Sequence, residues 1–237
     1  MISVIITSEN IDKNLITVDD KSDVNHLKNA FRVKVGEQIR AVDGEKEYIC
    51  EVMDISKKEV VLEIKETFED RYSLNTQIDA AIGILKNDKM DLTIQKLTEI
   101  GINKVIPLMT KRGVVKLSEK KDKWDLVVRE ALKQCQGVKP MIIDEVTRLD
   151  KLDINDYDLV ILPYECEEEY TLKNLLRKQD KEIKKVLYII GPEGGFDIEE
   201  VEELKSKGAN VVTLGKRILR AETASIVVGG VLINEFQ

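Results

Sequence analysis

Two glycine-containing stretches near the end of the chain place the tightest constraint on its fold. Residues 190–196 read IGPEGGF, and residues 214–224 read LGKRILRAETA. Each stretch follows an apolar run and opens a helical pattern. In α/β proteins, backbone that binds ligands lies where a strand ends in glycines and a helix begins. Two such turns, one strand apart, therefore predict two walls of a single pocket.

Strand and helix patterns alternate from about residue 76 to the end of the chain. The run 186–190 is apolar throughout, as in a central parallel strand. Trp124 begins an apolar helix face with the spacing i, i+3, i+4, i+7, which assigns its ring to the core rather than to base stacking. The alternation predicts an α/β domain whose parallel sheet is covered by helices on both faces.

Local signals predict where several of these elements lie. Asp88 and Thr223 are expected to cap helices, and Asp197 with Glu200 has the spacing of a capping box. The expected spans are strands 78–85, 105–109, 141–146, 159–163, 186–190 and 211–214, and helices 124–135, 170–178 and 221–236.

The N-terminal part of the chain follows a different rhythm. Residues 1–70 alternate apolar and polar side chains with period two, and turn signals separate the alternating runs. This pattern predicts a small antiparallel β-barrel with one helical segment at 26–32. Because the apolar pattern lapses at 67–75, we predict domains at 1–72 and 73–237.

The charge of the chain is distributed unevenly. Its formal net charge is −7, which by itself argues against nucleic acid. Residues 1–70 carry 10 basic and 16 acidic side chains, a net of −6, whereas residues 86–139 carry 13 basic and 7 acidic ones, a net of +6. Two interpretations of the basic middle stand side by side: it faces a polyanion, or it is a solvated lysine-rich face.

Residue counts argue against several classes of site. A single histidine, His26, disfavours a His-rich metal site and a Ser-His-Asp triad. Three widely spaced cysteines without a CxxC pair indicate neither a zinc site nor a disulfide framework, and they suit a reduced cytosolic protein. The chain shows no signal-peptide pattern and no apolar run near the ~20 residues of a membrane span. We therefore expect no metal and no membrane contact.

The charged residues of the two turns suggest their chemistry. Glu193 is the only charge in the first turn, which matches neither a dinucleotide nor a phosphate-loop motif and suits a neutral or cationic ligand. Taken alone, this turn is better explained as a tight entry into a helix. Lys216, Arg217 and Arg220 suit an anionic substrate or a developing oxyanion. Glu222 beside Arg220 suits either a general base or a structural clamp.

These turns, with further motifs upstream, resemble the SPOUT class of S-adenosylmethionine-dependent RNA methyltransferases. More narrowly, they are similar to the bacterial family that methylates N3 of a uridine in 16S rRNA. The resemblance covers nearly the whole chain, and its motifs follow in the family's order at residues 26–36, 42–44, 86–101, 110–112, 130–135, 164–165, 190–196 and 214–224.

The resemblance implies a PUA-like N-terminal β-barrel that binds RNA and a C-terminal SPOUT α/β domain with a parallel sheet. It further implies a trefoil knot within about residues 158–237, an exception to ordinary chain connectivity. The implied protein is a cytoplasmic homodimer that uses S-adenosyl-L-methionine and acts on 16S rRNA of the small ribosomal subunit. The expected product is N3-methyluridine at position 1498.

The resemblance also implies site residues. Arg220 is the expected cation at a uracil carbonyl oxygen, where it would stabilise the anion left when N3 loses its proton. Glu193 or Glu222 is expected to accept that proton or to hold Arg220, and the residues leave this choice open. The expected RNA contacts are Arg32, Lys86, Lys111, Arg112 and Lys116. The expected cofactor contacts, made chiefly by backbone, are Leu162, Pro163, Ile190, Gly191, Glu193, Gly194, Gly195, Leu214, Gly215, Ile218, Leu219 and Arg220.

The chain departs from the family pattern at Gln136 and Gly137, where an arginine is expected, and this puts RNA contacts in question more than cofactor binding. Two alternatives stay open: another SPOUT enzyme with a different RNA target, and a non-catalytic RNA-binding ribosome-assembly factor. A nucleotide-binding dehydrogenase is disfavoured because its glycine fingerprint is missing.

Overall fold

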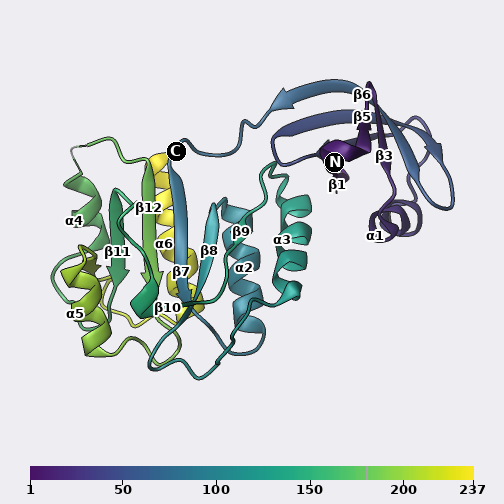
Figure 1. Cartoon of the computed structure of the whole chain (residues 1–237). Helices are drawn as coiled ribbons and strands as arrows, with labels where there is room; N and C mark the ends of the chain where they lie inside the picture. The colour runs from purple at the N-terminus through teal and green to yellow at the C-terminus, as the bar shows by residue number, and fades with distance from the viewer. Residues whose placement is uncertain (180) are drawn as a thin grey trace. The chain divides into compact units, whose positions relative to one another are not determined.

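The computed structural model describes residues 1–179 and 181–237, which divide into two compact units (Figure 1). Helix α3 (Asp122–Cys135) contributes to both units. Every helix in the described ranges is too short or too polar to span a bilayer. The first unit consists of residues 1–73 and 129–140, and the second of residues 74–128 and 141–237.

The first unit contains a six-stranded sheet in the order β1-β4-β5-β6-β3-β2. Register shifts between β5 and β6 bend these long strands, so that the sheet curls around an apolar core. The predicted antiparallel arrangement is wrong in one pairing, because β1 runs parallel to β4. The long connection between these two strands permits that pairing. The strands are β1 (Ser3–Ile5), β2 (Ile11–Asp12), β3 (Leu15–Val18), β4 (Gln38–Val42), β5 (Lys46–Ile55) and β6 (Val60–Glu69).

A short helical segment lies between β3 and β4. The carboxylate of Asp20 accepts two backbone N–H groups at the start of α1 (Lys21–Asn25), and a π-helical turn, η2 (His26–Ala30), continues it. The prediction placed a helix at 26–32. The helix begins at Lys21 instead, because the Asp20 cap precedes the apolar pattern that suggested it.

A buried arginine joins residues 129–140 to the rest of the first unit. Arg40 is 1% exposed, and its Nε lies 2.5 Å from Glu47 Oε1. Its Nη2 donates to the carbonyl oxygens of Gln136 and Gly137, at 2.8 and 3.1 Å. The segment that departs from the family pattern is therefore part of the packing around Arg40.

The second unit contains a parallel sheet in the order β10-β8-β7-β12-β11-β13, with β9 beside β8. β12 lies between β7 and β11, and its residues 186–190 are all buried, which confirms the predicted central strand. The strand predicted at 141–146 is limited to β9, since Asp144 and Glu145 end its apolar pattern. The strands are β7 (Gln77–Gly83), β8 (Lys104–Met109), β9 (Ile142–Ile143), β10 (Thr147–Arg148), β11 (Leu159–Pro163), β12 (Lys185–Ile190) and β13 (Asn210–Val212).

Helices cover both faces of this sheet (Figure 1). One face, with Tyr188 of β12, packs against helices α2, α3, α4 and α6. The other face, with Leu187 and Ile189, packs against α5. Trp124 is buried in the first of these layers, as predicted, and the predicted α/β architecture is confirmed. The helices introduced here are α2 (Asp88–Ile100), α4 (Leu172–Arg177), α5 (Ile198–Ser206) and α6 (Ala221–Phe236).

The N-caps of two helices differ from the predicted ones, although the predicted helices are present. The capping box that begins at Asp197 is present. Asn87, rather than Asp88, is the N-cap of α2 and has a φ of 52°. Arg220, rather than Thr223, is the N-cap of α6. Both predictions were wrong because the path of the entering chain, not the capping preference of one side chain, decides which residue leaves helical geometry.

Tyr188 carries a polar group that the fold leaves unsatisfied. Its side chain is fully buried, and its hydroxyl has no hydrogen-bond partner within the described ranges. Because such a group destabilises the folded state, Tyr188→Phe is expected to raise the free energy of unfolding by about 1 kcal/mol in urea denaturation. Tyr157→Phe is the matched control and is expected to lower it, since the Tyr157 hydroxyl donates to Asp79 Oδ2 at 2.7 Å. Equal losses in both variants would contradict this account.

Candidate active site

The carboxyl ends of three adjacent parallel strands bring the predicted cofactor turns together. β12 and β13 flank β11 in the sheet, and all three strands run in the same direction. Pro163 ends β11, Ile190 ends β12 and Val212 ends β13. The segments that follow these residues therefore emerge at one edge of the sheet, where open α/β sheets bind their ligands.

The first glycine turn is packed so closely that side chains are excluded from it. A Cβ added to Gly195 would lie 2.6 Å from Glu165 Oε1, and Gly195 has a φ of 66°. A Cβ added to Gly83, at the end of β7, would lie 2.4 Å from the backbone nitrogen of Pro192. Because the atom close to Gly83 belongs to backbone, only glycine fits there, whereas at Gly195 the left-handed φ favours glycine.

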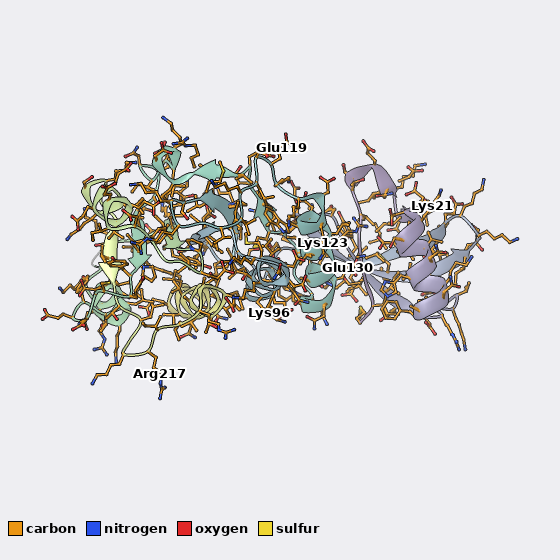
Figure 2. All side chains as sticks on the ribbon, turned by 90° about the horizontal axis from the view of Figure 1, so that it is seen from below. Lys21, Lys96, Glu119, Lys123, Glu130 and Arg217 are labelled. Carbon is orange, nitrogen blue, oxygen red and sulfur yellow. The ribbon has the colours of Figure 1, made fainter. Side chains whose placement is uncertain are left out.

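The second turn is open by comparison. Gly215 has a φ of 120°, and no heavy atom of the described residues lies within 4 Å of a Cβ added there. Ile218 is 85% exposed, and Arg217 reaches away from the ribbon in Figure 2. Leu214 and Leu219 are half-buried against the core of the second unit. The turn therefore offers accessible backbone beside apolar side chains, a combination typical of small-molecule sites.

A lysine links the two turns. Lys89, in the first turn of α2, places its Nζ 3.6 Å from Glu193 Oε1 and 3.6 Å from Glu222 Oε1. Among the described residues, neither glutamate forms an ion pair with Arg220, so the cation between them is Lys89. Arg220 itself is exposed at the start of α6.

The two glutamates differ in their surroundings. Burial raises the pKa of Glu193, but the N–H that Lys86 donates to its Oε1 at 3.0 Å, together with the charge of Lys89, outweighs burial and leaves the pKa lowered. Glu222 Oε2 is buried and has no hydrogen-bond partner within the described ranges. Glu193 is thus held as a bound carboxylate, whereas Glu222 retains an oxygen that can accept a hydrogen bond or a proton.

The cations proposed to contact RNA fall into two groups. Lys111 donates its backbone N–H to Glu200 Oε1 at 2.7 Å and pairs through its ammonium with Glu199, and Arg112 lies 3.2 Å from Asp197. These contacts at the start of α5 offset the charges of both residues, as expected for a solvated face. The side chains of Arg32, Lys86 and Lys116 are exposed.

Sequence reasoning missed three residues that shape this site. Lys89 was part of a longer motif and had no role of its own, and Gly83 was in no motif. Glu165 was included only as the last residue of the turn 162–165, one of three turns that the resemblance assigns to the cofactor. The local signal was weak, because a lysine near a helix start and a glycine after an apolar run are both common. Their importance comes from contacts with segments far along the chain.

Comparison with known proteins agrees with this geometry. A family model described as an RNA methyltransferase domain matches residues 72–233, more than half of the chain. The chain belongs to the RNA methyltransferase family. A second model, described as an RNA methyltransferase PUA domain, matches residues 18–65 of this methyltransferase.

Individual relatives show which RNA methyltransferases this chain resembles most specifically. This methyltransferase is 32% identical over 225 residues to ribosomal RNA small subunit methyltransferase E of Rickettsia conorii, a match that covers 93% of this chain and 90% of the relative. It is 31% identical over 215 residues to the protein of the same name from Bacillus subtilis, with 86% and 84% covered. The structure of a proposed methyltransferase from Legionella pneumophila in complex with S-adenosylmethionine superposes with a TM-score of 0.85 at 27% identity, with 98% and 96% covered. The resemblance inferred from the motifs is confirmed.

Proposed function

We propose that this protein transfers a methyl group from S-adenosyl-L-methionine to N3 of a uridine in 16S rRNA, at position 1498. The observation that carries the proposal is the meeting of two glycine turns, two glutamates and Lys89 at one edge of a parallel sheet. The relatives of this chain are named small-subunit rRNA methyltransferases, which supports the same function.

The residues at this edge fit the cofactor. When bound, S-adenosyl-L-methionine supplies a methyl group on a positively charged sulfur. Leu162 and Ile190 are buried, so the segments at the ends of β11, β12 and β13 would bind mainly through backbone groups. The accessible side of Gly215 leaves room for a ring. The carboxylates of Glu193 and Glu222 favour a cationic ligand over a phosphate.

We assign the proton acceptor to Glu222. Uridine N3 becomes a good nucleophile only when its proton leaves, and an acceptor needs an oxygen that is not already engaged. Glu222 Oε2 meets that requirement and is buried. The N–H of Lys86 and the charge of Lys89 lower the pKa of Glu193 and make it the weaker base. Lys89 and Arg220 would then stabilise the negative charge that develops on the base, in the role first expected of Arg220 alone.

RNA binding and architecture complete the proposal. We assign RNA binding to a PUA-like domain at 1–72 and to the exposed side chains Arg32, Lys86 and Lys116, with smaller contributions from Lys111 and Arg112. The catalytic SPOUT domain spans 73–237, with its trefoil knot within about 158–237. Because small ribosomal subunits are its substrate, the enzyme acts in the cytoplasm.

Helix α6 supports a homodimer. Only Glu222 and Glu235 are charged among its 16 residues, and Val227 and Val231, one turn apart, are 42% and 41% exposed. A helix that is apolar all round is normally buried, and a second copy of the same helix would cover this face. The double variant Val227→Asp/Val231→Asp is therefore expected to run as a monomer in size-exclusion chromatography with light scattering. Leu126→Asp, at another exposed apolar residue, is the control, and a monomeric wild type would contradict the dimer.

Methyl transfer from labelled cofactor tests the function directly. Small ribosomal subunits, naked 16S rRNA and large subunits are compared as substrates, and the modified nucleoside is then identified by mass spectrometry. Label found as N3-methyluridine in small-subunit RNA supports the proposal. Label at another base would indicate a different target, and cofactor binding without transfer would indicate a non-catalytic RNA-binding factor.

A further inference from the structure

A pocket of about 510 Å³ lies within the first unit, and all of its lining residues belong to that unit. Its volume is within the range of about 300–1,000 Å³ that is typical of small-molecule sites. The walls are mostly apolar with a few polar groups, the usual composition of a specific binding pocket. The lining includes Ile2, Val4, Leu27, Phe31, Lys133 and Gln134.

A π-helical turn places two aromatic rings in the wall of this pocket. The Phe31 N–H donates to the His26 carbonyl at 3.0 Å, which closes the i to i+5 turn of η2. This wider turn brings the two side chains onto one face, where the ring centroids are 4.6 Å apart and the planes differ by 12°. Both residues are exposed, Phe31 at 48%. π turns are rare in helices and are frequent at functional sites.

The backbone beside the rings is also unusual. Arg32 has a φ of 54°, in the left-handed region that residues other than glycine seldom adopt, and such residues cluster at ligand sites. Arg32 and Lys34 are both exposed, and neither forms an ion pair with any residue in the described part of the chain. Two available cations thus follow the aromatic pair directly in sequence.

The acidic groups of the pocket are already neutralised. Asp23 is buried and pairs with Arg129 and with Lys133, whose Nζ lies 2.6 Å from Asp23 Oδ1. Glu130, labelled on α3 in Figure 2, lies 2.9 Å from the same Nζ. These carboxylates therefore do not oppose an anionic ligand at the pocket.

We propose that this pocket binds one unpaired nucleobase of the substrate RNA. The base stacks on the outer face of the His26–Phe31 pair, because aromatic side chains bind bases through their faces. Arg32 and Lys34 contact the flanking phosphates, and the exposed amide of Gln134 offers a donor and an acceptor to the base edge. The inference rests on RNA as the substrate, and it adds a binding site in the first unit to the site of methyl transfer.

The single histidine of the chain makes a direct test possible. In this chain of 237 residues, the ring protons of His26 give the only histidine resonances. A short single-stranded oligoribonucleotide is expected to shift these resonances upfield in a saturable titration, because a stacked base shields them. A double-stranded RNA of the same sequence, whose bases are already stacked and paired, is expected to leave them in place.

Variants measure what the contact contributes. Phe31→Ala is expected to weaken oligoribonucleotide binding about tenfold or more in fluorescence anisotropy, in line with the loss of one base–aromatic stack. It should raise KM for the RNA substrate by a similar factor and leave kcat nearly unchanged. Phe31→Tyr is expected to retain binding, and Met53→Ala, at an exposed apolar side chain outside the pocket lining, serves as the control.

The outcomes separate this inference from the proposed function. Normal methyl transfer by Phe31→Ala with unchanged RNA affinity, or a His26 resonance that no single strand moves, would overturn the pocket and leave the function intact. Shifts that depend on protein concentration without RNA would assign the pocket to a second copy of the chain. A shifted resonance in a protein that transfers no methyl group would instead overturn the function. If Phe31→Ala unfolds, the titration of the unaltered protein still decides.

Discussion

Glu222→Gln is expected to lower kcat for methyl transfer by about a hundredfold or more, the usual contribution of a positioned general base. Glutamine preserves the shape of the side chain but cannot take a proton from uridine N3. The variant should therefore fold normally and bind S-adenosyl-L-methionine in calorimetry, while single-turnover transfer to the small subunit is slow. The expectation depends on the buried, unpartnered Oε2 of Glu222.

Two further variants make this result specific. Glu235→Gln changes an exposed glutamate of the same helix and should leave the rate within about twofold of wild type, because surface changes away from a site have small effects. Glu193→Gln should affect the rate less than Glu222→Gln, since Glu193 is already engaged with the N–H of Lys86. The reverse order of the two losses would assign the proton acceptor to Glu193.

Arg40→Met is expected to lower the free energy of unfolding of the first unit by about 3–5 kcal/mol, the range found when one partner of a buried ion pair is removed. The substitution removes the buried cation at Glu47 Oε1, so that Glu47 keeps only the half-exposed Arg71, at 3.0 Å from its Oε2. It also removes the donors to the carbonyl oxygens of Gln136 and Gly137. Amide hydrogen exchange in the first unit, measured at increasing urea concentrations, gives the loss in free energy of unfolding.

Matched variants test the cause of that loss. Arg40→Met combined with Glu47→Leu should recover part of the stability, because both charges are then absent. Arg148→Met, which breaks an exposed pair with Asp150, should cost less than about 1 kcal/mol. Burial raises the pKa of Glu47, but the hydrogen bond and charge of Arg40 outweigh this and leave it lowered. The stabilisation is therefore present above the ordinary glutamate range and is lost as pH falls through the lowered pKa. Equal losses in Arg40→Met and Arg148→Met would contradict the assignment.

Elements that depend on neighbours in sequence were predicted well. The spans of α6 and β11 match their predicted bounds, and the capping box at Asp197 is present, because helical and strand periodicity and capping involve residues only a few positions apart. The central position of β12 also followed from its composition, since a strand buried on both faces must be apolar throughout.

Elements that depend on distant partners were not predictable in the same way. The parallel pairing of β1 with β4 and the membership of residues 129–140 in the first unit involve contacts between segments far apart in the chain. The same holds for the buried partners of Arg40. Local sequence patterns do not indicate which distant segment a residue will contact.

The candidate site shows the same division. The sequence by itself determined the α/β architecture, the two glycine turns and the set of residues that marks an RNA methyltransferase. Each of these depends on patterns among residues only a few positions apart. Only the tertiary structure decided that Lys89, rather than Arg220, lies between Glu193 and Glu222. It also decided that Glu193 is held by backbone while Glu222 retains a buried, unengaged oxygen. The packing of α2 against α6 brings Lys89 to Glu222, and the pairing of β7 with β12 brings Glu193 to the start of α2. Both arrangements join segments far apart in the chain, and the packing of the whole unit sets them.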